Sequence, residues 1–207
     1  MGIGTDKKGN GSGGGLPAII DDARLRPVFE KVVAGERLGY EDGLLLYRSP
    51  DLLTVGYMAN MVRERLHGNI TYFNVNRHIN PTDVCVASCR LCAFGKKSKD
   101  PNAYTMSLEE VWHRAGLGWS ESITEFHIVG GLHPTLTLDW YCRMVAGLKE
   151  RFPQVHIKAF TMVEIAYFAQ REKLSYREVL ERLVRAGVDS MPGGGAEVFS
   201  ERVRRII

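Results

Sequence analysis

The sequence predicts an α/β protein in which N-terminal helices precede the first four βα units of a TIM-type (β/α) barrel, left incomplete. Its 44% hydrophobic and 25% charged residues are ordinary for a globular protein. Helical periodicity dominates up to about residue 70, and short β-rich runs alternate with capped helices after it. A full barrel takes about 250 residues. Residues 71–207 therefore predict either a half-sheet protein or a chain without the C-terminal half of a barrel.

The N-terminal part is predicted to hold a leader and a helical segment. Residues 1–15 are rich in glycine and offer almost nothing to bury, so we interpret them as a flexible leader. Residues 16–70 form an N-terminal helical segment, whose first helix is predicted to stop at Gly35. Its second helix is predicted to begin at Ser49 as N-cap and to end at Gly68.

Residues 71–207 form the predicted partial barrel domain. Its strand-like runs are Thr71–Ile79, Ile123–Val129, Val155–Thr161 and Val188–Met191. Helices are predicted at 107–117, 138–152 and 175–187, with a last one from about residue 198. Two of them open on a capping box, the Ser-x-x-Glu pattern in which the serine and the glutamate each bond the other's backbone amide.

Charge and hydropathy exclude two classes of function. A net charge of +3 is too small for the electrostatic footprint of a nucleic-acid-binding protein. The longest apolar run without a charge is far shorter than the roughly 20 residues of a membrane span, and the N-terminus lacks the apolar core of a signal peptide. We therefore expect a cytoplasmic protein with no nucleic-acid partner and no membrane span.

Three of the four cysteines fall within eight residues after the first strand, at Cys85, Cys89 and Cys92. Three thiolates from one short loop can hold three corners of a cubane iron-sulfur cluster, which leaves one iron open to another ligand. The alternative is a structural zinc site, closed by His78 or His133 as the fourth ligand. Cys142 lies inside a predicted helix, and we interpret it as a core residue.

The triplet, followed by Ala93-Phe94, resembles the signature of the radical S-adenosylmethionine (SAM) superfamily. The resemblance implies that the cysteines hold a 4Fe-4S cluster whose fourth iron is chelated by SAM. It implies that Leu91 stands near the adenine, where the family usually has an aromatic residue. It also implies that the turn after the second strand meets the methionine part of SAM through Gly130, Gly131 and His133.

Three further segments, 74–80, 156–161 and 192–197, resemble the branch that holds futalosine-pathway enzymes and deazaflavin (FO) synthases. Within it, they are most similar to the aminofutalosine synthase family of menaquinone biosynthesis. That resemblance implies a transferase that adds the adenosyl radical of SAM to 3-[(1-carboxyvinyl)oxy]benzoate and forms aminodeoxyfutalosine. It also implies an electron donor such as flavodoxin or ferredoxin, and no catalytic residue beyond the cluster. The alternatives are a sister dehypoxanthine futalosine cyclase, an FO synthase subunit, a zinc-binding module or an inactive fragment.

A substrate with two carboxylates calls for cationic groups at the mouth of the barrel, and the candidates are Arg77, His78, His133 and Lys158. Side chains alternate along a strand, so we expect only one of Arg77 and His78 to face the interior, with Arg77 slightly favoured. Lys158 is expected to be functional if it faces inward and to extend along the helix layer if it faces outward.

Further contacts with SAM are expected in the loops after the third and fourth strands. Glu164 and Glu197 could bond a ribose hydroxyl or the amino group, although either could instead be a first-turn helix charge. The run Gly193, Gly194 and Gly195 is costly in backbone entropy unless a ligand or a tight turn requires it.

The lysines after the triplet, Lys96, Lys97 and Lys99, are interpreted as a solvated loop, with steering of an anionic substrate or a reductant as the alternative. Half a barrel also leaves a sheet edge and apolar faces uncovered. We therefore predict that these 207 residues alone self-associate. A concentration-independent monomer in sedimentation would contradict this prediction.

Overall fold

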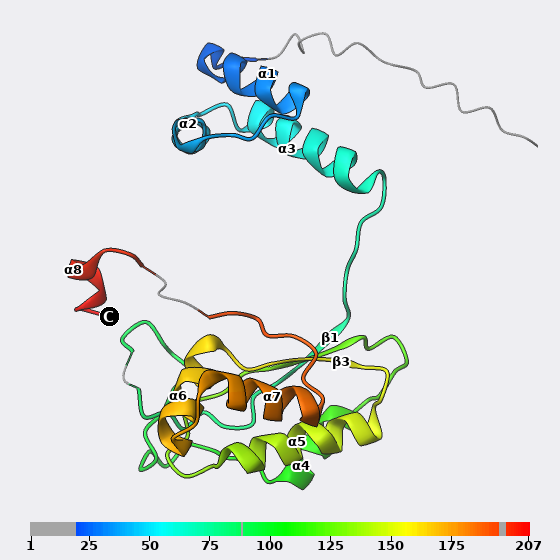
Figure 1. Cartoon of the computed structure of the whole chain (residues 1–207), viewed down its shortest axis with the longest axis vertical. Coiled ribbons are helices and arrows are strands. Elements are labelled where there is room, and N and C mark those ends of the chain that lie inside the picture. The colour runs from blue at the N-terminus through cyan, green and yellow to red at the C-terminus, as the bar shows by residue number, and fades with distance from the viewer. Residues whose placement is uncertain (1–19, 88, 195–197) are drawn as a thin grey trace, which may run out of the picture. The chain divides into compact units, whose positions relative to one another are not determined.

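The computed structural model describes residues 20–87, 89–194 and 198–207 (Figure 1). The leader predicted at 1–15 lies outside these residues. The chain divides into two compact units between Tyr72 and Phe73. Each unit has a hydrophobic core of its own, so each is described by itself.

The first unit consists of a short 3-10 helix and three α-helices: η1 (Ala23–Leu25), α1 (Arg26–Ala34), α2 (Tyr40–Arg48) and α3 (Leu52–His67). α1 ends at Gly35, as predicted, and Gly35 adopts the left-handed conformation, with φ 74°. The predicted start of the next helix at Ser49 is wrong, because the N-cap of α3 is Asp51, whose carboxylate accepts the Thr54 amide at 3.0 Å. The hydroxyl of Ser49 instead donates to Asp22 at 2.8 Å.

The second unit is built on three parallel strands in the order β1 (Asn76–Ile79), β2 (Glu125–Ile128) and β3 (His156–Ala159). The register aligns His78, His127 and Lys158 in one row across the sheet. The run predicted as a fourth strand, Val188–Met191, follows the same edge but makes only one isolated parallel bridge, Lys158 with Ser190, and the chain makes a second one beyond the run, Thr161 with Gly193. Pro192 interrupts it because proline has no amide to donate. The α/β class and the incomplete parallel barrel are confirmed.

The helices of the second unit are α4 (Leu108–Gly116), α5 (Leu138–Arg151), α6 (Met162–Glu172), α7 (Tyr176–Ala186) and α8 (Glu201–Arg204). The capping boxes predicted for α4 and α7 are confirmed at Ser107 and Ser175. Helix α6 was not predicted, although it starts on the same pattern, with Thr161 as N-cap and Glu164 at the third helical position. The pattern was overlooked because Thr161 was assigned to the preceding strand.

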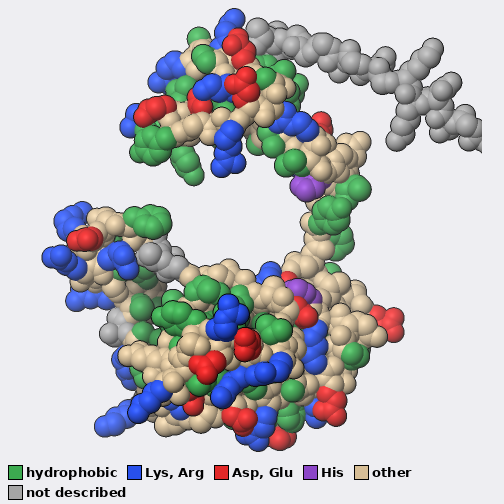
Figure 2. All heavy atoms as spheres, viewed as in Figure 1, with side chains coloured by type: hydrophobic (Ala, Val, Ile, Leu, Met, Phe, Trp, Pro, Cys, Tyr) green, Lys and Arg blue, Asp and Glu red, His purple; other side chains and the backbone are tan. Residues whose placement is uncertain are grey.

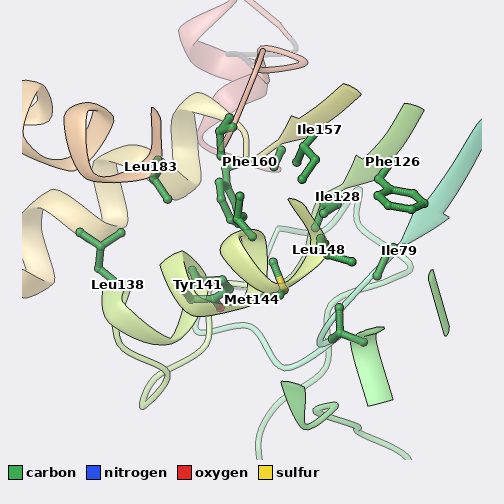
Figure 3. Packing of buried hydrophobic residues seen from close by; sticks show 14 of the residues in the cluster. Ile79, Phe126, Ile128, Leu138, Tyr141, Met144, Leu148, Ile157, Phe160 and Leu183 are labelled. Carbon is green, nitrogen blue, oxygen red and sulfur yellow. The ribbon is translucent and has the colours of Figure 1, made fainter. Parts of the chain in front are cut away.

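The core of the second unit lies between the sheet and α4, α5, α6 and α7, which cover one face of it (Figures 1 and 3). Phe126, Ile128 and Ile157 point into this layer and are fully buried. They pack among Met144 and Leu148 of α5. Because side chains alternate along a strand, the opposite face carries the polar residues between them, and this is the face that would line a barrel interior.

Figure 2 shows acidic and basic side chains among hydrophobic ones on one face of each unit, with basic side chains predominating at the C-terminal end around α8. In the described residues, no helix has the length and hydropathy needed to cross a membrane.

Candidate functional site

The cysteine triplet lies in the loop between β1 and α4, at the carboxyl end of the sheet. The two ends of this loop run side by side, with an isolated parallel bridge between Val84 and Lys96. The Cys85 amide donates to the Lys96 carbonyl at 2.8 Å, and the Lys96 amide donates to the Asp83 carbonyl at 2.7 Å. These backbone hydrogen bonds close the base of the loop without a contribution from a ligand.

The sulfurs of Cys85 and Cys92 both lie near Gly95. A Cβ placed on Gly95 would lie 3.9 Å from the Cys85 sulfur and 3.7 Å from the Cys92 sulfur. Two backbone amides donate to these sulfurs, Leu132 to Cys85 at 3.4 Å and Gly95 to Cys92 at 3.3 Å. Such donors stabilise thiolates and tune the clusters that thiolates hold. Cys89 and Cys92 are exposed and Cys85 is half-buried, so the loop is open to a ligand.

In the part of the chain that the structure describes, no three His, Cys, Asp or Glu side chains come together as ligands of one ion, so the three cysteines are not gathered around one point either. The ring of His133 faces its own turn, where Nδ1 accepts the amides of Thr135 and Leu136 at 3.2 and 3.1 Å. The ring of His78 packs edge-on against His127, at 5.1 Å between centroids. An all-thiolate donor set fits an iron-sulfur cluster.

The glycine turn after β2 is docked against the cysteine loop by its backbone. The Gly131 amide donates to the Thr82 carbonyl, and the Val86 amide donates to the Leu132 carbonyl, both at 3.0 Å. A Cβ on Gly131 would overlap the Val84 carbonyl oxygen and lie 2.7 Å from its carbon. The structure thus gives a different reason for Gly131 from the expected approach of a ligand, because the other loop already occupies that space.

Glu164 connects the start of α6 to this turn. Its carboxylate accepts the Thr161 amide at 2.7 Å and the Thr161 hydroxyl at 2.9 Å through Oε2, and the Gly130 amide at 3.2 Å through Oε1. The side chain is only 3% exposed. Burial raises the pKa of Glu164 to about 7, although the three hydrogen bonds oppose the shift. Both carboxylate oxygens of Glu164 accept hydrogen bonds from the protein, so this buried side chain holds the glycine turn in shape.

The raised pKa of Glu164 predicts a pH-dependent stability. The folded state holds the proton more tightly than the unfolded one, so this contribution is fully present below pH 4.5 and is lost as pH rises through about 7. We expect the free energy of unfolding of the wild type, relative to Glu164→Gln, to fall by up to about 3 kcal/mol between pH 4.5 and 8. Urea unfolding at several pH values measures it.

The equivalent capping residue of α7 provides the matched control. Hydrogen bonds from the Ser175 amide and hydroxyl lower the pKa of Glu178, so its contribution is present at neutral pH and is lost on acidification. Glu178→Gln should therefore change the pH profile in the opposite direction. Identical profiles for the two variants would contradict the assignment of Glu164.

The inner face of the sheet carries the row His78, His127 and Lys158, with Glu125 one layer below. The Lys158 ammonium pairs with Glu125 Oε2 at 3.0 Å, and His127 Nδ1 lies 3.7 Å from Oε1. The Glu125 side chain is 8% exposed, and Oε1 has no hydrogen-bond partner. Lys158 thus faces inward, the arrangement expected of a functional residue. His127 was missed, because its direction follows only from the register of β2.

Arg77 lies on the other face, which corrects the expectation that it rather than His78 faces inward. Its guanidinium donates to the carbonyl of Ala115, in the last turn of α4, at 2.6 Å. It also donates to the carbonyl of Gly118, just beyond that helix, at 3.2 Å. Helix C-termini offer unpaired carbonyls that attract arginine. His78 is therefore the β1 side chain on the inner face, where burial and the neighbouring His127 lower its pKa.

The remaining predicted residues lie at the edges of this site. Leu91 is exposed on the cysteine loop. Gly193 and Gly194 have φ of 99° and 88°, and a Cβ on Gly194 would lie 2.7 Å from that of Thr161, so a tight turn against α6 explains them. Gly195 and Glu197 lie outside the described residues. Cys142 packs on the core from α5, and burial raises the pKa of its thiol.

Comparisons with known proteins agree on one family. The profile of the radical SAM superfamily matches residues 79–207. The chain is 45% identical to an aminodeoxyfutalosine synthase of Thermus thermophilus over 188 residues, which is 91% of this chain and 50% of that protein. It is 41% identical to a 5-amino-6-(D-ribitylamino)uracil–L-tyrosine 4-hydroxyphenyl transferase of Methanopyrus kandleri, over 89% of this chain and 50% of the relative. The chain thus spans about half the length of these curated relatives.

A solved structure shows the same fold. The crystal structure of methylornithine synthase superposes with a TM-score of 0.55 at 17% identity, covering 78% of this chain and 56% of that one.

Proposed function

The chain belongs to the radical SAM superfamily, and from this premise we propose that Cys85, Cys89 and Cys92 bind a 4Fe-4S cluster whose fourth iron is left for SAM. The observation that carries the proposal is the docking of the cysteine loop on the glycine turn after β2. Their hydrogen bonds, Val86 to Leu132 and Gly131 to Thr82, are both 3.0 Å long. When bound, the cluster and SAM supply the 5'-deoxyadenosyl radical, and the residues of the chain bind and orient the reactants.

We propose that the reaction is that of an aminodeoxyfutalosine synthase, which the 45% identity over 91% of this chain supports. The substrate would be 3-[(1-carboxyvinyl)oxy]benzoate, and the products aminodeoxyfutalosine, methionine and bicarbonate. The reaction would belong to menaquinone biosynthesis in the cytoplasm, with a flavodoxin or ferredoxin as electron donor.

The inner row of the sheet would receive the anionic substrate. His78 on β1 and Lys158 on β3 lie at one level of the sheet, with His127 of β2 between them, and the Lys158 ammonium could make a charge-assisted hydrogen bond to a carboxylate. Glu125 holds the ammonium of Lys158 in place. Arg77 is left out of this assignment, because the end of α4 takes its guanidinium.

On the SAM side, the turn at Gly130 and Gly131 would meet the methionine part through its carbonyl groups, because its two amides already donate to Glu164 and Thr82, and Glu164 would hold that turn in shape. His133 belongs to the same turn and would lie on the methionine side, whereas Leu91 would border the adenine, with the turn at Gly193 and Gly194 as a further contact with SAM.

Anaerobic reconstitution with iron and sulfide tests the cluster. About four irons per chain, a broad visible absorbance and an electron paramagnetic resonance (EPR) signal that SAM perturbs would support the proposal. One zinc and no sulfide would favour a binding module instead.

Incubation with SAM, reductant and one acceptor at a time then tests the substrate. The enol-ether benzoate should give aminodeoxyfutalosine by mass spectrometry. Product only with tyrosine and 5-amino-6-(D-ribitylamino)uracil would favour the activity of the second relative.

A further inference from the structure

The segment that returns from the cysteine loop carries two consecutive lysines that bond the loop itself. The Lys96 ammonium pairs with the carboxylate of Asp83 at 2.9 Å, and this carboxylate is only 2% exposed. The Lys97 ammonium donates to the carbonyls of Ala87 at 2.7 Å and Val86 at 3.1 Å. Lys97 is exposed and Lys96 half-buried, so the segment remains a solvated loop, but both lysines are bonded to the loop that they follow.

The two lysines hold different parts of the loop. Lys96 and Asp83 close its base, where Asp83 also accepts the Tyr104 amide at 2.7 Å. Lys97 reaches further, to the spacer between Cys85 and Cys89. The carbonyls of this spacer would otherwise be left to solvent, and an ammonium with three donors and no acceptor can bond two of them at once.

The spacer is thereby held from two sides. The glycine turn takes the amide of Val86 through the Leu132 carbonyl at 3.0 Å, and Lys97 takes its carbonyl. The direction of the Cys85 side chain depends on the peptide that follows it, so both contacts constrain how its sulfur is presented. Lys97 also places a positive charge on the loop that carries the cysteines, whose thiolates are negatively charged when they bind metal.

We propose that Lys97 is a positioning residue for the cluster. Lys97 closes the spacer between Cys85 and Cys89, and its positive charge favours the reduced, more negatively charged state of the cluster. The inference rests on the cluster of the proposed function and not on its substrate. Arrangement of metal ligands and stabilisation of charge by groups that do not touch the metal are general properties of such sites.

The first test uses the metal-free protein and needs no cluster. Iodoacetamide alkylation of Cys85 at pH 9.5, where an ordinary thiol is roughly nine-tenths ionised and the lost charge changes the thiolate fraction little, should be several-fold faster in Lys97→Met than in the wild type, because the spacer opens. Peptide mass spectrometry follows the reaction. Lys97→Arg should restore the wild-type rate, since a guanidinium can bond both carbonyls. Lys99→Met is the matched control, because Lys99 is an exposed lysine on the same segment. Equal Cys85 rates in Lys97→Met and the wild type would overturn the positioning role.

The second test measures how the charge of Lys97 affects the midpoint potential of the cluster. After reconstitution, the midpoint potential, titrated at low ionic strength and followed by EPR, should shift downward in Lys97→Met and stay near the wild-type value in Lys97→Arg and Lys99→Met. An unchanged potential in Lys97→Met would overturn the electrostatic part. A wild-type protein that takes up no iron would overturn the proposed function, while the alkylation rates would still decide whether Lys97 holds the spacer.

Discussion

Single replacement of Cys85, Cys89 or Cys92 by alanine is expected to abolish stable binding of the cluster. Each thiolate holds one corner of the cubane, and the fourth iron has no protein thiolate, so the loss of one leaves only two anchors. Iron and sulfide per chain after anaerobic reconstitution should fall from about four of each to background, and the visible absorbance should disappear with them.

Cys142→Ala is the control for this series, because Cys142 packs on the core from α5 and its thiol is not part of the loop. It should keep its iron content and its spectrum. A full cluster in any of the three loop variants, or its loss in Cys142→Ala, would refute the ligand assignment.

Gly131→Ala is expected to separate the cysteine loop from the glycine turn. The new methyl group would overlap the Val84 carbonyl oxygen and lie 3.1 Å from Cys85 Cβ. The nearest obstacle is backbone, which cannot rotate away as a flexible side chain does, so one of the two loops must move. We expect a loss of roughly 1–3 kcal/mol in the free energy of unfolding, the usual range for overpacking, together with most of the iron binding.

Gly56→Ala is the matched control, because a Cβ at Gly56 on α3 meets nothing within 4 Å. Alanine is favoured over glycine inside a helix by up to about 1 kcal/mol, so this variant should unfold at a slightly higher denaturant concentration. Denaturant unfolding and iron analysis measure both substitutions. Gly131→Ala with wild-type stability and iron content would show that the turn and the loop are not packed in this way.

Local signals predicted much of the fold. The Ser-x-x-Glu pattern located the starts of α4 and α7, because a capping box depends only on residues three positions apart. The same signal at Thr161 and Glu164 was present for α6 and was overlooked. The N-cap of α3 could not be chosen from type alone, since Ser49 and Asp51 are both good N-caps.

The cysteine spacing and the glycine turn pointed to the site, but the directions of side chains did not follow from the sequence. Alternation shows that Arg77 and His78 face opposite sides without showing which side is inner. That choice depends on pairing with β2, where the buried Phe126 lies beside Arg77. The contacts of Lys97 likewise depend on the path of the loop, which no local pattern encodes.

The bonds between the cysteine loop and the glycine turn have a consequence for the order of folding. Thr82 and Val86 bond Gly131 and Leu132, which lie more than 40 residues further along the chain. Contacts at such separations close late, because the entropy of the intervening segment must be lost first. The pairing of β1 with β2 closes a segment of the same length, since Asn76 pairs with Glu125. The ligand loop therefore takes its shape together with the sheet, and iron loading should not precede sheet formation.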